Sequence, residues 1–155
     1  MYGNEKVVFI DINYIFTNSN VGKELNIQIL NKDKKLRSEI NEIKKQIEDQ
    51  KVKILSQKNV LTAEEYNKKI EMLEKEIKDI NLKIKKKDEV LKLFKKNIEN
   101  LFSKNLNSII EEYSVQNSIG IIFNKSDLLM AKKDLDITQE VLKIFNNKIK
   151  ELKFN

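Results

Sequence analysis

The sequence predicts an α+β fold that is mostly α, with a long antiparallel coiled-coil hairpin arm on a small β-strand body. Composition is the first reason: Pro is absent, Gly occurs 3 times in 155 residues and charged residues make up 35%, which favours long helices. The second reason is a heptad pattern on both sides of a short break. The third is a set of apolar, β-branched runs near both ends of the chain. We assign residues 23–116 to the arm and residues 1–22 and 117–155 to the body.

The body begins with an apolar run at residues 6–11, which predicts a strand. Residues 12–16 fit one helical turn, and the Asn- and Ser-rich residues 17–22 predict a turn-rich break. The first arm helix should then occupy residues 23–56. Its apolar seam has spacings of 7, 4, 3, 4 and 7 residues and consists of Ile29, Leu36, Ile40, Ile43, Ile47 and Ile54.

Three polar residues, Asn26, Asp33 and Gln50, interrupt this seam. Polar seam residues set the register of a coiled coil at a cost in stability. Residues 57–61 should form the tip of the hairpin. Thr62 and Glu65 then predict a capping box, in which each side chain accepts from the backbone amide of the other residue.

The second arm helix should run from this cap to about Tyr113 or Gln116. Lys87 breaks its apolar seam at one position. Each arm helix has one narrow apolar seam to bury, so the two helices must fold back on each other. The seam residues are Tyr66, Ile70, Leu73, Ile77, Ile80, Ile84, Leu91, Phe94, Ile98 and Leu101.

After the arm, residues 118–124 predict a second strand and residues 127–132 a weaker third one. Asp136 should cap a final helix, with Gln139 three residues further on. Three short strands make a poor sheet with open edges, so we expect them to pair between subunits. The candidate oligomerisation residues are Val7, Val8, Phe9, Ile10, Ile119, Ile121, Ile122, Phe123, Leu128 and Leu129.

The sequence argues against catalysis, cofactors and metal sites. Cys and His are both absent, which removes disulfides, thiolate metal sites and His-based general bases. Gly22 and Lys23 could end a phosphate-binding loop, but Thr17 and Glu24 stand where its Gly and its Ser or Thr are required. The carboxylates lie among lysines at helix-surface spacings. We therefore expect a binding protein rather than an enzyme.

A second, off-seam apolar stripe is one candidate binding surface. Its residues lie well away from the seam on the helical wheel, and they are Met72, Leu82, Val90 and Leu93 on the second helix and Val52 and Leu55 on the first. Ile27 and Leu30 lie off the seam of the first helix as well. Scattered surface residues or packing between arms would explain the same pattern.

A lysine belt is the other candidate surface, with seven lysines against Asp88 and Glu89. Its members are Lys83, Lys85, Lys86, Lys87, Lys92, Lys95 and Lys96. Nucleic-acid grooves usually carry Arg and stacking aromatics. Arg37 is the one arginine here, and Phe94 belongs to the seam. A general electrostatic surface therefore fits the belt better than a nucleic-acid site.

The order of strand, arm, strand pair and capped helix resembles the Skp (OmpH-like) family of periplasmic chaperones for outer-membrane proteins. The matching pieces are the strand at residues 7–11, the Gly-Lys step at residues 19–23, the helix restart at residues 61–65, the strands at residues 119–129 and the Asp-Ile-Thr start at residues 136–138. Asn117-Ser118-Ile119-Gly120 departs from the family's Gly-aromatic opening of the second strand.

The resemblance implies a jellyfish-like homotrimer whose arms hold unfolded outer-membrane proteins in a shared cavity without ATP. It also implies the periplasm, although no signal peptide is visible in this chain, and the lack of Cys suits that oxidising compartment. An anionic lipid surface is a further candidate partner. The alternatives are a prefoldin-like cytosolic holdase, whose strands would lie between the arm helices, and a basic structural or nucleic-acid-binding coiled coil.

Overall fold

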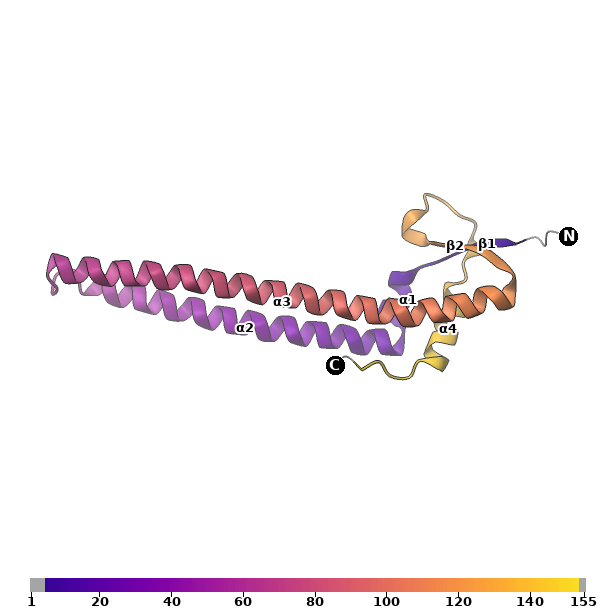
Figure 1. Ribbon diagram of the computed structural model, residues 1–155, viewed down its shortest axis with the longest axis horizontal. Coiled ribbons are helices and arrows are strands. Elements are labelled where there is room, and N and C mark those ends of the chain that lie inside the picture. The colour runs from indigo at the N-terminus through magenta and orange to yellow at the C-terminus, as the bar shows by residue number, and fades with distance from the viewer. Residues whose placement is uncertain (1–4, 154–155) are drawn as a thin grey trace. The chain divides into compact units, whose positions relative to one another are not determined.

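The computed structural model describes residues 5–153, and the ends 1–4 and 154–155 of the predicted body lie outside the described residues. By their contacts, the residues form two compact units, one made of residues up to 29 with those from 95 onward, the other of residues 30–94. In chain order the elements are β1 (Lys6–Ile10), α1 (Ile12–Asn18), α2 (Asn20–Ser56), α3 (Ala63–Asn117), β2 (Ile119–Asn124), the 3₁₀ turns η1 (Lys125–Asp127) and η2 (Lys133–Leu135), and α4 (Thr138–Lys148) (Figure 1).

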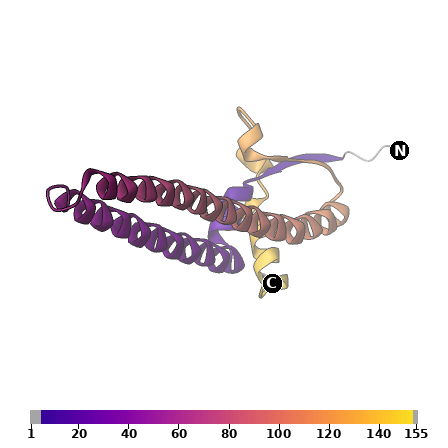
Figure 2. The ribbon, with the colours of Figure 1, turned by 60° about the vertical axis from the view of Figure 1, so that its left-hand side comes forward.

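The 30–94 unit is the predicted hairpin. Its parts of α2 and α3 run side by side in opposite directions in both views (Figures 1 and 2). The seam is confirmed, because Leu36 and Leu73 are only 8% and 6% exposed and the other seam residues of this unit are half-buried. Of the polar seam residues, Gln50 donates from Nε2 to Glu76 Oε1 at 3.4 Å, so it pairs across the hairpin.

The predicted tip and its capping box are confirmed. Residues 57–62 lie outside both helices. The Thr62 amide donates to Glu65 Oε2 at 3.0 Å, and the Glu65 amide donates to Thr62 Oγ1 at 3.3 Å. The two residues therefore satisfy each other's backbone amides at the start of α3.

The other unit contains one two-stranded sheet. β1 pairs with β2 in parallel, with Val8 opposite Ile122. Parallel strands need a long crossover, and here the chain between them contains both long helices. The other edge of β1 is covered at one point, where the Ile137 amide donates to the Phe9 carbonyl at 3.0 Å.

The predicted third strand at residues 127–132 is wrong. The chain makes η1, an irregular stretch and η2 there. Leu129 and Met130 are almost fully exposed, so they have no neighbouring strand among the described residues. The β1 edge that could have taken a third strand is instead bridged by Asp136 and Ile137.

The predicted turn-rich break at residues 17–22 is also wrong, because α1 extends to Asn18 and α2 begins at Asn20. Ser19 alone separates the helices. Its buried hydroxyl accepts from the Gly22 amide at 3.0 Å and so caps α2.

The final helix begins slightly later than predicted. Asp136 accepts from the Thr138 amide at 2.9 Å, but α4 starts at Thr138 and is preceded by Ile137. Phe145, on the apolar face of α4, packs against Phe102 with ring centroids 5.1 Å apart. The core of this unit thus joins α3 to α4, and the Asp11 amide donates to Thr138 Oγ1 at 2.9 Å.

Candidate functional site

Lys87, predicted as part of the lysine belt, lies in the hairpin seam. Its ammonium pairs with the carboxylate of Glu39 on the opposite helix. The two side chains are 29% and 37% exposed. The hydrogen bond from Lys87 is the main reason that the pKa of Glu39 is lowered. Lys87 is therefore already engaged by an intramolecular ion pair, unlike the other lysines of the belt.

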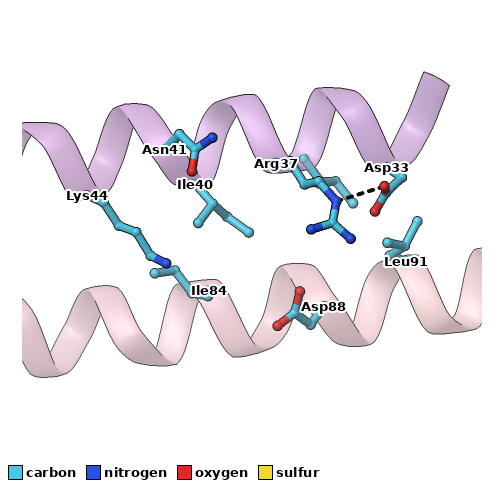
Figure 3. A pocket seen from close by; sticks show the side chains of 9 residues that line it. Asp33, Arg37, Ile40, Asn41, Lys44, Ile84, Asp88 and Leu91 are labelled. Carbon is cyan, nitrogen blue, oxygen red and sulfur yellow. Dashed lines mark hydrogen bonds and ion pairs between the residues drawn. The ribbon is translucent and has the colours of Figure 1, made fainter. Parts of the chain in front are cut away.

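A hollow of about 290 Å³ lies beside this charged layer. It opens where Lys87 takes a seam position between Ile84 and Leu91, so apolar packing is interrupted. Figure 3 shows Arg37 pointing into the gap between the helices, with Asp33 on its own helix and Asp88 on the other.

The charges that line this mid-hairpin hollow balance one another. Arg37 Nε donates to Asp33 Oδ2 at 2.8 Å. This hydrogen bond, and then the charges of Asp33 and Asp88, raise the pKa of Arg37. With Lys44 the lining has two cations and two acids, which leaves it without a net charge. Polar seam residues of this kind are suited to fixing register.

The off-seam stripe is exposed along the 30–94 unit. Exposed fractions run from 50% to 66% for Val90, Leu55, Leu82, Val52, Leu93 and Met72. The buried seam leucines of the same helices show that these six residues are not needed to close the hairpin. At least half of each side chain is therefore open to solvent.

A second hollow, of about 270 Å³, lies next to the tip and has a mainly apolar lining. Ile54 of α2 and Met72 and Leu73 of α3 supply its apolar lining. Lys53, Lys69 and Glu76 are its charged residues. Lys69 is held in place because its ammonium donates to Gln57 Oε1 at 2.7 Å.

The other belt residues, Lys83, Lys85, Lys86, Lys92, Lys95 and Lys96, are exposed. None of these six forms an ion pair with another residue in the 5–153 range. Their charge is therefore open to solvent and to an anionic partner.

The candidate oligomerisation residues divide into three groups by their burial. Val8, Phe9 and Ile10 are buried within the chain, where they form its own core. Ile119, Ile122 and Leu128 are half-buried. Val7, Ile121, Phe123 and Leu129 remain exposed, so an apolar surface lies along the sheet.

The sequence did not reveal either hollow, because side-chain packing between two helices creates them. One signal was present: Lys87 interrupts the seam between Ile84 and Leu91, which both line the mid-hairpin hollow. Among residues 5–153 no group of three or more acidic side chains is placed to hold a metal ion. None of the described helices is long and apolar enough to cross a membrane.

The fold defines a class of protein: an antiparallel helical hairpin joined to a small unit with a two-stranded parallel sheet. The family model described as "Outer membrane protein (OmpH-like)" matches residues 6–145. The chain therefore belongs to the OmpH-like family, and the resemblance found in the sequence is confirmed.

A solved structure gives the same fold. It is a crystal structure from Caulobacter crescentus, of a protein described as an OmpH-like outer membrane chaperone. The TM-score is 0.83 at 14% identity, covering 97% of this chain and 89% of the other. None of the curated protein sequences compared matches the chain at a significant level.

Proposed function

We propose that this protein is an ATP-independent holdase that binds unfolded outer-membrane β-barrel proteins and prevents their aggregation. The observation that carries the proposal is the apolar stripe on the hairpin, six residues each at least half exposed on helices whose seam is separately buried. Exposed apolar residues that gather along one side of a helix fit an interaction site. Membership of the OmpH-like family, and the chaperone description of the Caulobacter protein, point to outer-membrane proteins as clients.

Holding works through two weak interactions. The unpaired lysines attract anionic segments at long range, an effect that salt screens. The exposed stripe then makes many small apolar contacts with the client. Weak individual contacts let the client leave again without an energy source, so no nucleotide is required.

Several copies supply the needed avidity. In this proposal the small β-strand body is shared between subunits in a homotrimer, and the client lies in the cavity between three arms. The exposed Val7, Ile121 and Phe123 support a shared body, and β2 pairs only with β1 among the described residues. Linked arms multiply weak contacts.

The proposed location is the periplasm, which membership of the OmpH-like family supports. An anionic lipid surface is a second partner in this proposal, since the exposed lysines of the belt would be attracted to it.

A prefoldin-like holdase fits less well. Its strands would lie between the arm helices, whereas here only the turn at residues 57–62 joins α2 to α3. The nucleic-acid alternative also fits less well. The chain has a single arginine, and the aromatic residue within the lysine belt, Phe94, belongs to the seam.

Two parallel binding experiments test the proposal against nucleic-acid binding. The full chain is offered a urea-unfolded outer-membrane β-barrel protein and, separately, duplex DNA, without nucleotide. We expect the barrel to stay soluble and DNA binding to vanish at moderate salt. Salt-resistant DNA binding with no protection of the barrel would overturn the proposal.

A further inference from the structure

The hollow next to the tip combines apolar lining with unmatched positive charge. Ile54, Met72 and Leu73 face the space, and Met72 is 66% exposed. Met is flexible and polarisable, which suits surfaces that accept varied apolar side chains. This hollow also contains a residue of the off-seam stripe, so stripe and cavity meet here.

Charge distinguishes this hollow from the mid-hairpin one. The mid-hairpin lining contains two cations, Arg37 and Lys44, and two acids, Asp33 and Asp88, so its charges balance. The hollow next to the tip has two lysines and one glutamate.

The surrounding sequence adds to this charge. Residues 51–69 contain five lysines and two glutamates. Glu65 is engaged in the capping box with Thr62, and the Lys53 ammonium forms no ion pair within the described part of the chain.

We propose that this hollow is a docking site for an extended client segment with an apolar side chain next to a carboxylate. The apolar side chain enters between Ile54, Met72 and Leu73. The carboxylate is held by Lys53, and by Lys69, whose ammonium is already oriented by Gln57. The inference rests on the proposed function and deepens it, because it places first contact with the client near the tip and selects acidic, apolar segments.

Two methionine variants test the site in the full-length protein. Met72→Ser removes a lining residue, and Met130→Ser removes an exposed methionine that does not line the hollow and belongs to neither the stripe nor the belt. The probe is a fluorescently labelled peptide of alternating Leu and Asp, followed by anisotropy. We expect Met72→Ser to weaken peptide binding about tenfold, the effect of losing one large apolar side chain, and Met130→Ser less than about twofold.

The charge is tested by a second matched pair. Lys53→Gln with Lys69→Gln should weaken binding of the Leu-Asp peptide, whereas Lys132→Gln with Lys133→Gln, two exposed lysines outside both the hollow and the belt, should change it far less at moderate salt. A peptide with Lys in place of Asp should bind at least about tenfold more weakly than the Leu-Asp peptide. Circular dichroism checks that each variant keeps its helix content.

Equal losses for Met72→Ser and Met130→Ser, or equal binding of the two peptides, would overturn the docking site. The docking site would also be overturned if Met72→Ser left peptide binding intact and abolished binding to anionic phosphatidylglycerol vesicles. That result would assign the hollow to lipid. If the barrel client is protected equally by wild type and Met72→Ser, the docking site fails and the holdase proposal stands. If the peptide binds as expected but the client aggregates, the holdase proposal fails and the site stands.

Discussion

Gly22 lies against the backbone of the preceding helix. A Cβ atom at this position would lie 1.8 Å from the Phe16 carbonyl oxygen and 2.6 Å from Ser19 Oγ. Only a residue without a side chain lets α1 and α2 meet with one linking residue. The same position lies in the Gly-Lys step that resembles the family, so that sequence feature now has a steric cause.

Gly22→Ala should therefore destabilise the unit that contains the sheet. We expect a loss of about 1–3 kcal/mol or more in the free energy of unfolding, the range for overpacking a close contact. Gly120→Ala is the comparison, because the three nearest atoms to its Cβ would all belong to the Glu5 side chain, with Oε2 at 2.5 Å and Cβ at 2.9 Å, rather than to the backbone of another turn. Urea unfolding compares the two variants, and equal losses would contradict the steric explanation.

Two errors of the sequence interpretation arise at this scale. Asn and Ser residues favour turns, but at residues 17–20 they lie at helix ends, where Ser19 caps α2. The second strand was predicted from residue 118 but begins at Ile119. Ser118 has a φ of 53°, and this left-handed residue directly separates α3 from β2. Composition alone shows neither, because both depend on how one residue fits its neighbours.

At the scale of the element, the heptad pattern predicted the hairpin well. Its apolar residues must face the partner helix, so spacing alone identifies the buried side chains. The third strand was predicted wrongly because local spacing does not show which segment a strand will pair with. A strand depends on a partner distant in sequence, and the β1 edge is bridged by residues 136–137 instead.

Seam and off-seam leucines of α3 should differ sharply in stability. Leu73→Ala removes a side chain that is 6% exposed and should cost about 2–3 kcal/mol. Leu82→Ala should change stability by no more than about 0.5 kcal/mol, since Leu82 is 55% exposed on the helix surface. Thermal unfolding followed by circular dichroism measures both, and similar losses would show that the seam was assigned to the wrong face.

The capping box should make the hairpin sensitive to acid. The hydrogen bond from the Thr62 amide, and then that from the Thr62 hydroxyl, lower the pKa of Glu65 below its ordinary value of 4.5. Its contribution to stability is therefore fully present above that value and is lost as pH falls through the lower native pKa.

The Glu65→Gln variant isolates this effect, because its neutral amide still accepts from Thr62 at every pH. We expect the urea midpoint of the wild type to fall more steeply than that of the variant as pH drops below 4.5. Parallel pH profiles would mean that the Glu65 carboxylate does not stabilise the start of α3.

At the scale of the whole molecule, the proposed trimer depends on apolar residues left exposed along the sheet. Ile121→Lys places a charge in this surface and should lower the mass measured by light scattering toward the 18.3 kDa of one chain. Val115→Lys is the control, because Val115 is 84% exposed on α3, outside the sheet. A wild-type protein that is monomeric at micromolar concentration would refute the shared body.

The exposed stripe on the hairpin is the feature on which the account of function depends most. The direct measurement is light scattering of an unfolded outer-membrane β-barrel protein diluted from urea, without nucleotide. It compares the wild type with a variant in which Met72, Leu82, Val90 and Leu93 are replaced by Ser, at equal helix content. The account predicts that the wild type suppresses aggregation and that the variant largely loses this ability. Equal suppression by both proteins would contradict it.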